Sequence, residues 1–300
     1  MRISTSTLYG LSSTAMNDIQ SKNVKTLQQI SSGKRILTPS DDPSAATQAL
    51  TVSQAKAVNT QYSKNMDTAQ NALTTSDNVL SNINDTLQDI RTTALTASSF
   101  TDDQRQSAIV ALQSQLTTLT NLANSKDADG NYLYSGTLGS TQPFTTDSNG
   151  VVQYNGNDDP RNMQIGENQT ATVNDSGNSI FMNINGSGQS MFDTINNLIT
   201  VLQTPGSNIS AGAQTAVSGL NDAIANISSM RASVGARMNS LTSQQDASSN
   251  MDTQYQGRLS QLQDLDYNTA ATTLAQQQTQ LQAAQKAFSY ISGMSLFSYL

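Results

Sequence analysis

The stretch LDYNTAATTLAQQQTQLQAAQKAFSYISGMSLFSYL, residues 265–300, repeats apolar residues with the spacing of a coiled-coil seam. One seam position, at every seventh residue, holds Tyr267, Leu274, Leu281 and Phe288, and a second position three residues later holds Ala270, Gln277, Ala284 and Ile291. The intervening residues are mostly Gln, Thr, Ser and Ala, so the apolar stripe is narrow. A helix with so little apolar surface gains its stability from packing, and the pattern therefore predicts a partner helix.

A similar thin stripe lies at the N-terminus. It predicts a helix from about residue 5 to about residue 32 that ends at Gly33, with these residues at helical spacing: Leu8, Leu11, Ala15, Ile19, Leu27 and Ile30. Four basic residues near its end, Lys22, Lys25, Lys34 and Arg35, favour a solvated face. The segment ILTPSDDPS, residues 36–44, predicts a turn, with Asp42 or Ser40 as the N-cap of the next helix and Pro43 in its first turn.

The longest periodic segment runs from Ala45 to Ala97. Its two seam positions are sustained over eight heptads, the first holding Ala45, Val52, Asn59, Met66, Leu73, Leu80, Leu87 and Ala94, and the second holding Gln48, Ala55, Tyr62, Ala69, Ser76, Ile83, Ile90 and Ala97. The segment predicts one helix roughly 80 Å long. Thr101 or Asp102 is expected to cap a shorter helix that follows and extends to about Ala123.

The middle of the chain has a different pattern. Apolar and polar residues alternate between Asp-Gly, Asn-Gly and Asp-Ser-Gly pairs, which favour hairpin turns. Helical spacing resumes near Met191 and continues, after a break at residues 204–208, to the C-terminal seam. We therefore predict a mainly α fold in which the two ends of the chain form a long antiparallel helical coiled coil, or rod, with a small mostly-β insertion.

Three domains follow from these boundaries. Residues 1–40 with 262–300 are expected to form a terminal coiled-coil domain, and residues 41–130 with 190–261 a helical rod. Residues 131–189 are expected to form a mostly-β surface domain.

Composition restricts the chemistry of the chain. Hydrophobic residues make up 36% and charged residues 12%, both below the values of an ordinary globular domain, which favours long helical seams over a thick core. The formal net charge of −7 argues against a nucleic-acid partner. The chain has no Cys and no His, the residues most used as nucleophiles, general bases and zinc ligands. No secretion signal peptide or membrane-spanning segment is predicted, and no metal or cofactor is expected.

Two groups of acidic residues leave other possibilities open. The sequence Asp127-Ala128-Asp129-Gly130-Asn131 is weakly similar to a calcium loop, but it lacks the closing glutamate, so a simple Asp-Gly turn is favoured. Asp158 or Asp159 together with Asp175 would supply the carboxylate pair of a glycosidase. Nothing in the sequence positions that pair, and we expect no enzymatic activity.

Taken together, both helical arms resemble the bacterial flagellin superfamily. The resemblance rests on ISSGKRI (residues 30–36), DDPSAA (41–46), VGARMNSL (234–241) and the stretch from Leu262 to Leu300. Within the superfamily the chain is most similar to the hook-associated protein 3 family, because of SDDP (40–43), GNYLYSG (130–136) followed by Pro143-Phe144, and YNGN (154–157). The β region itself carries no further motif of the family.

The resemblance implies a structural subunit of the extracellular bacterial flagellum, in a junction layer between hook-associated protein 1 and the flagellin filament. Its implied partners are copies of itself, hook-associated protein 1, flagellin and a type III export chaperone. The terminal helices would fold together on assembly through a seam of Leu8, Leu11, Ile19, Leu27, Ile30, Tyr267, Leu274, Leu281, Phe288, Ile291, Leu296 and Leu300. The alternatives are a short filament flagellin and a cytoplasmic coiled-coil signalling rod.

Overall fold

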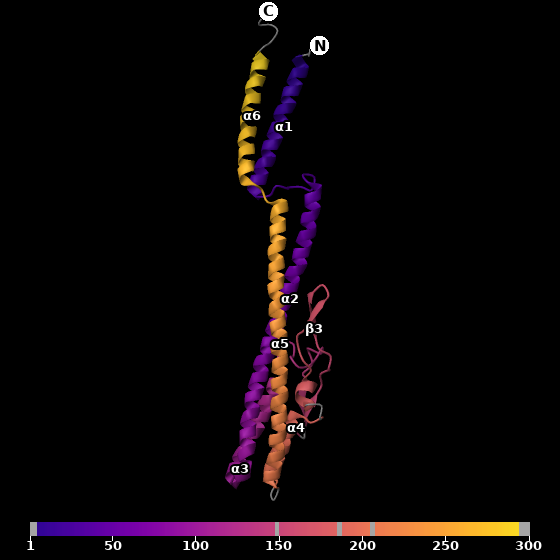
Figure 1. Cartoon of the computed structure of the whole chain (residues 1–300), viewed down its shortest axis with the longest axis vertical. Helices are drawn as coiled ribbons and strands as arrows, with labels where there is room; N and C mark the ends of the chain where they lie inside the picture. The colour runs from indigo at the N-terminus through magenta and orange to yellow at the C-terminus, as the bar shows by residue number, and fades with distance from the viewer. Residues whose placement is uncertain (1–4, 148–149, 185–187, 205–207, 294–300) are drawn as a thin grey trace, which may run out of the picture. The chain divides into compact units, whose positions relative to one another are not determined.

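The computed structural model describes residues 5–147, 150–184, 188–204 and 208–293. Its backbone divides into two units, residues 1–58 with 250–300 and residues 59–249. The first unit contains α1 (Thr5–Ser32), α6 (Tyr267–Gly293), the beginning of α2 (Pro43–Thr96) and the end of α5 (Ile209–Gln263) (Figure 1). The mainly helical fold, in which N- and C-terminal helices pack together, is confirmed. The division into three domains stays a prediction.

The second unit holds the rest of α2 and α5, with α3 (Asp102–Ala123), α4 (Met191–Gln203) and the small β region. Its core is one cluster of buried side chains drawn from all of these parts. The predicted heptads of α2 are buried as expected at Leu73, Leu80 and Leu87, each 0% exposed. One predicted seam residue is wrong, because Gln48 is exposed and Ala49 is buried in its place. Gln48 keeps its polar side-chain amide in solvent, and the small apolar side chain of Ala49 is buried.

Helix ends in both units follow local chemistry. Gly33, with φ of 70°, adopts the left-handed conformation that ends α1. The Asp42 carboxylate accepts the Ala45 amide at 3.0 Å, so Asp42 caps α2 and Pro43 is its first residue. Thr101 caps α3 in a capping box with Gln104.

The β region consists of two separate hairpins joined by turns. β1 (Phe144–Thr146) pairs with β2 (Val152–Tyr154), and β3 (Asn162–Gly166) pairs with β4 (Gln169–Thr172), both antiparallel. A short π-helix, η2 (Asn178–Met182), follows, and a 3₁₀ turn, η1 (Ala97–Ser99), ends α2. Buried rings hold the region to α4, with Phe144 centred 5.4 Å from Phe181 and 5.6 Å from Phe192.

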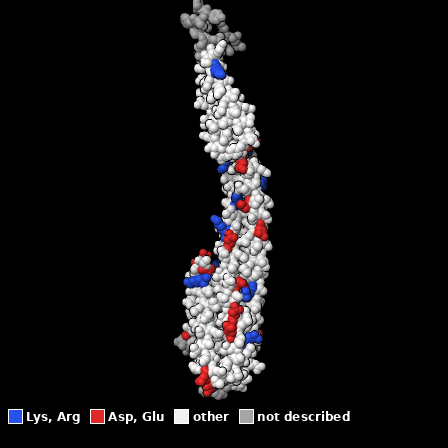
Figure 2. Space-filling view, turned by 90° about the vertical axis from the view of Figure 1, so that its left-hand side faces the viewer, with Lys and Arg blue, Asp and Glu red and all other residues white. Residues whose placement is uncertain are grey.

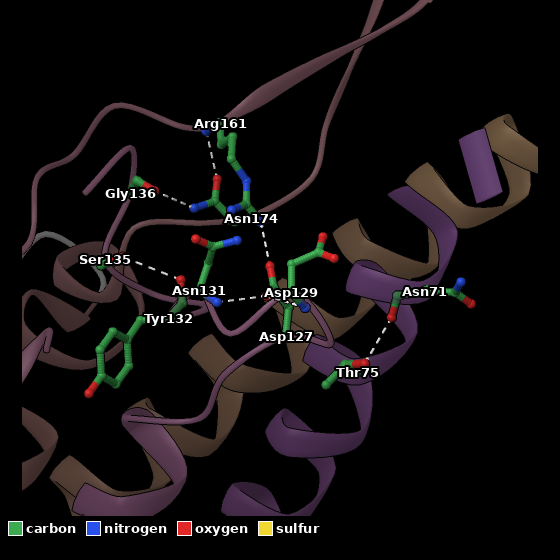
Figure 3. Close-up of polar contacts among 10 residues, drawn as sticks. All are labelled: Asn71, Thr75, Asp127, Asp129, Asn131, Tyr132, Ser135, Gly136, Arg161 and Asn174. Atoms are coloured by element: carbon green, nitrogen blue, oxygen red, sulfur yellow. Dashed lines mark hydrogen bonds and ion pairs between the residues drawn. The ribbon is translucent and has the colours of Figure 1, made fainter. Parts of the chain in front are cut away.

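The Asp-Gly turn at residues 127–131 is confirmed (Figure 3). One carboxylate oxygen of Asp127 accepts the amides of Asp129 and Asn131 at 3.0 and 2.8 Å, and Gly130 has φ of 83°. The other oxygen accepts the Arg161 guanidinium at 2.9 Å. The positive charge next to the Asp127 carboxylate is therefore supplied by the side chain of Arg161.

The carboxylates of the glycosidase hypothesis also have structural contacts. Asp158 accepts hydrogen bonds from Ser176 at 2.6 Å and from Asn178 at 3.1 Å. Asp175 forms an ion pair with Arg237 of α5. These contacts hold the β region together and attach it to α5.

Candidate assembly surface

α1 and α6 pack against each other in the first unit, and their least exposed side chains recur with heptad spacing. We call this set the inner seam. It comprises Tyr9, Ser12, Met16, Ile19, Asn23, Thr26 and Ile30 of α1 and Ala270, Leu274, Gln277, Leu281, Ala284 and Phe288 of α6. The rings of Tyr9 and Phe288 meet edge to face at 5.7 Å. After Tyr267, the heptad positions of α6 whose side chains are described therefore face α1, as their spacing in the sequence predicts.

The N-terminal half of the predicted seam lies differently. Ile19 and Ile30 belong to the inner seam, but Leu11 is 63% exposed and Leu27 is 49% exposed. Tyr267, at the start of α6, is also exposed. The side chains of Leu8 and Ile291, and Leu296 and Leu300 altogether, lie outside what the structure describes.

A second set of residues, which we call the outer face, comprises large exposed apolar side chains of α1 and α6. It consists of Leu11, Val24, Leu27, Tyr267 and Tyr290, all of them exposed. Charged side chains are rare around it, since α6 carries only Lys286 and α1 carries Asp18, Lys22 and Lys25. The part formed by α1 and α6 is accordingly almost free of charge in Figure 2. Exposed apolar residues with few charges are typical of a surface that another protein covers.

Part of the outer face borders a groove of about 520 Å³. Val24 and Leu37 give the groove apolar walls, and Lys25 and Asp41 lie at its charged side. Asn17, Gln20, Ser21, Gln28 and Thr38 supply polar groups. The groove brings α1 together with the turn that leads to α2.

The inner seam contains two unsatisfied polar atoms. Oδ1 of Asn23 and Oε1 of Gln277 are buried and have no hydrogen-bond partner among the described residues. An unpaired buried carbonyl costs about 1–3 kcal/mol. Polar residues in a helical seam are a known means of fixing the register of two helices.

We expect replacement of both Asn23 and Gln277 by leucine to stabilise the α1–α6 pair, because two unsatisfied oxygens give way to apolar contacts. The gain should be about 1–3 kcal/mol, read from slower amide hydrogen exchange in α1 and α6. Gln28→Leu, at an exposed position of α1, is the control and should leave the exchange rates unchanged. Faster exchange in the double variant would contradict the prediction.

A compact junction connects the helix pair to α2 and α5. The Gly33 carbonyl accepts the Leu265 amide at 3.0 Å, and the Arg35 amide donates to the Gln263 carbonyl at 2.7 Å. The Arg35 guanidinium donates to the Leu262 carbonyl at 2.9 Å. The sequence predicted a domain boundary at residue 262 but no end of the helix there, and the break between α5 and α6 contains neither Gly nor Pro. Asp266 caps α6 there, accepting the Asn268 amide at 3.0 Å.

Two of the basic residues expected on a solvated face are exposed and also form ion pairs in this junction. Lys25 contacts Asp41 at 2.6 Å, and Arg35 contacts Asp42 at 3.3 Å. The Lys25 ammonium, helped by the amides of Thr38 and Leu37, lowers the pKa of Asp41 from 3.8 to about 2. The hydrogen bond from the Ala45 amide, followed by the Arg35 side chain, lowers the pKa of Asp42.

The Asp41 carboxylate predicts an acid transition of the junction. A depressed folded-state pKa adds stability that is present above the ordinary pKa of 3.8 and is lost as pH falls through about 2. We expect amide exchange at Leu37 and Thr38, corrected for its intrinsic pH dependence, to lose protection in that window. Lys25→Gln removes the largest cause of the shift and should move the loss to higher pH. Coincident profiles for the two proteins would contradict this assignment.

Comparison with known proteins shows which family has similar sequences. The model of the bacterial flagellin N-terminal helical region matches residues 3–138, and that of the flagellin C-terminal helical region matches residues 217–300. Flagellar hook-associated protein 3 of Escherichia coli K12 and that of Salmonella typhimurium LT2 are each 31% identical to the chain, over 99% of both sequences.

Solved structures show the same fold. A putative flagellar hook-associated protein from Vibrio parahaemolyticus is 25% identical, with a TM-score of 0.70 over 75% of this chain and 100% of that one. The flagellar junction protein FlgL from Legionella pneumophila is 18% identical, with a TM-score of 0.60 over 72% of this chain and 100% of that one.

Proposed function

Because this chain belongs to the flagellar hook-associated protein 3 family, we propose that it is a structural subunit of the bacterial flagellum, in the junction between hook and filament. Identity over the full length supports this assignment, since the relatives match the β region as well as both flagellin arms. The alternative of a short filament flagellin rests on the flagellin arms alone.

One observation carries the structural role. In α1 three aliphatic residues, Leu11, Val24 and Leu27, are exposed, while the inner seam contains Ser12, Asn23 and Thr26 beside Ile19 and Ile30. A helix that served only its own fold would bury its leucines. This distribution supports contacts between the outer face and neighbouring subunits.

The proposed contacts are between copies of the chain, through a different face on each side. Such heterologous contacts build rings or helical layers. The terminal domain of residues 1–40 and 262–300 would form the inner tube, and residues 41–130 with 190–261 would form the helical rod. Of the predicted assembly seam, Ile19, Ile30, Leu274, Leu281 and Phe288 would then form the helix pair, and Leu11, Leu27 and Tyr267 would contact the next copy.

The further partners we propose are hook-associated protein 1 on one side, flagellin on the other, and an export chaperone before assembly. The protein would act outside the cell after type III export. Within the described ranges, every helix is too short or too polar to span a bilayer.

Removal of the chain from its flagellated host tests the proposed function. We expect hooks that carry no filament, with flagellin released into the medium, and restoration by the intact chain. Copy number distinguishes the alternatives, because a junction layer needs about a dozen subunits per flagellum and a filament needs thousands. Thousands of copies along the filament would favour the flagellin alternative.

Amide exchange of the free monomer tests the signalling-rod alternative. A subunit that completes its fold on assembly should exchange faster in α1 and α6 than in the α2 core around Leu80. Equal protection of α1, α6 and α2 would favour a self-contained rod instead.

A further inference from the structure

A cavity of about 360 Å³ lies between α2 and the β region, within residues 59–249. The helix contributes Thr68, Asn71 and Thr75 to its lining, and the following turn and β region contribute Asp129 and Arg161. Small-molecule pockets usually have volumes of about 300–1,000 Å³, so this cavity has room for a small ligand. It is separate from the α1–α6 pair, to which assembly is assigned.

The guanidinium of Arg161 is only partly satisfied by the fold. Its Nη2 donates to the Asp127 carboxylate at 2.9 Å, whereas its Nε is buried and has no acceptor among the described residues. Nη1 also has no acceptor there, but it is not buried, and the side chain as a whole is 28% exposed. Arg161 therefore offers an N–H group that can bind a ligand without displacing Asp127.

The carboxylate of Asp129 has no partner either. Its backbone amide donates to Asp127, which fixes the residue in the turn, but its exposed carboxylate bonds no described residue. In Figure 3 the carboxylate takes part in none of the contacts drawn, and it points to the side on which α2 lies. Arg161 and Asp129 thus bring opposite charges to one cavity without pairing with each other.

These two charges indicate the ligand. An ammonium group has only donors, and a carboxylate has only acceptors, so the first matches Asp129 and the second matches Arg161. The Thr75 hydroxyl donates to the Asn71 carbonyl at 2.9 Å, which leaves its lone pairs to accept a further ammonium proton. Apart from Asp129 and the Asp127–Arg161 pair, the described residues that line the cavity are uncharged, which favours a ligand without a third charge.

We propose that this cavity binds a zwitterionic α-amino acid with an uncharged side chain. Its ammonium group would contact Asp129, and its carboxylate would contact Arg161. Met163 of β3, which is half-buried, lines the cavity and provides an apolar wall for the side chain of the ligand. The bound amino acid would connect α2 with the turn at residues 127–131.

The test titrates the full chain with each uncharged L-amino acid in a calorimeter, up to about 10 mM. We expect at least one of them to bind with a Kd of about 1 mM or lower. Asp129→Asn should weaken binding about tenfold or more, because it removes the counter-charge of the ammonium group. The variant should fold normally, since the carboxylate has no contact to lose. Glu167→Gln removes the same charge from the exposed turn between β3 and β4, and this control should bind unchanged.

A second measurement changes the ligand and leaves the protein intact. The amide of the bound amino acid lacks the carboxylate, and its N-acetyl derivative lacks the ammonium group, so each should bind at least about tenfold more weakly. The backbone amides of Asp129 and Asn131 should exchange more slowly in the complex. No binding up to about 10 mM, unchanged binding by Asp129→Asn, or undiminished binding of either derivative would overturn the proposal.

Discussion

Leu281→Asp is expected to prevent assembly of the chain at the hook and to abolish motility. Leu281 is half-buried at the middle of the inner seam, where α6 packs against α1. An aspartate there removes apolar contact and places a charge in a seam whose described part holds none. The helix pair should separate, and the outer face would lose the support that positions Leu11 and Leu27.

The second unit should remain folded in this variant. Its core draws on residues 66–241, and Leu281 lies in the other unit. We therefore expect normal amide protection around Leu80, together with fast exchange in α1 and α6. The measurements are swimming, recovery of the chain on isolated hooks, and exchange of the purified monomer.

Thr279→Asp is the matched control for Leu281→Asp. It places the same charge two residues away, at an exposed position of α6. If Thr279→Asp keeps slow amide exchange in α1 and α6 and still fails to assemble, like Leu281→Asp, assembly depends on contacts outside the inner seam. Normal swimming by the Leu281→Asp variant would show that assembly does not require the inner seam.

The sequence predicted α6 more accurately than α1 for a physical reason. In α6 Leu274, Leu281 and Phe288, which recur at every seventh position, lie in the inner seam, so spacing alone gives the register. In α1 Leu11 and Leu27 lie outside it, and the inner seam combines Ile19 and Ile30 with Tyr9, Met16 and several polar residues. A pattern of apolar residues cannot distinguish a surface that packs within the subunit from one that packs between subunits.

The junction shows a second limit. Gly33 and Asp42 were predictable, because a helix end and an N-cap depend on local chemistry. The contacts of Arg35 with Gln263 and Leu262 join residues more than 200 positions apart, and no local pattern contains them. The break before α6 depends on the same contacts, with Asp266 as its only local sign.

Turn residues in the sequence predicted where the β region lies, but they did not predict how its strands and loops are arranged. Asp-Gly and Asn-Gly pairs predicted hairpins, and an Asn-Gly pair lies between β1 and β2, but β3 and β4 are joined at Glu167 and Asn168, where the sequence has no such pair. Much of the remaining region is held by polar side chains, for example by Asn174, which accepts the Arg161 amide at 2.6 Å and donates to the Gly136 carbonyl at 2.8 Å. Such contacts have no periodicity, so the sequence alone could not show which segments they join.

Leu87→Ala is expected to destabilise the second unit by about 3 kcal/mol, within the usual range of about 2–5 kcal/mol for a buried leucine. Leu87 is 0% exposed in the main core, and its removal leaves a cavity that rigid helices cannot close. For a unit of this size the midpoint of thermal unfolding should fall by roughly 6–12 °C. Helical circular dichroism during heating, with amide exchange to separate the two units, gives the measurement.

Leu95→Ala, eight residues further along α2, is the matched control. Leu95 is 56% exposed, so the same truncation should change stability by less than about 0.5 kcal/mol. Because Leu87 and the inner seam lie in different units, Leu87→Ala should leave exchange in α1 and α6 unchanged and should still assemble below its unfolding temperature. Loss of protection in α1 and α6 together with the core would instead mean that the two units unfold cooperatively, and that assembly depends on the stability of both.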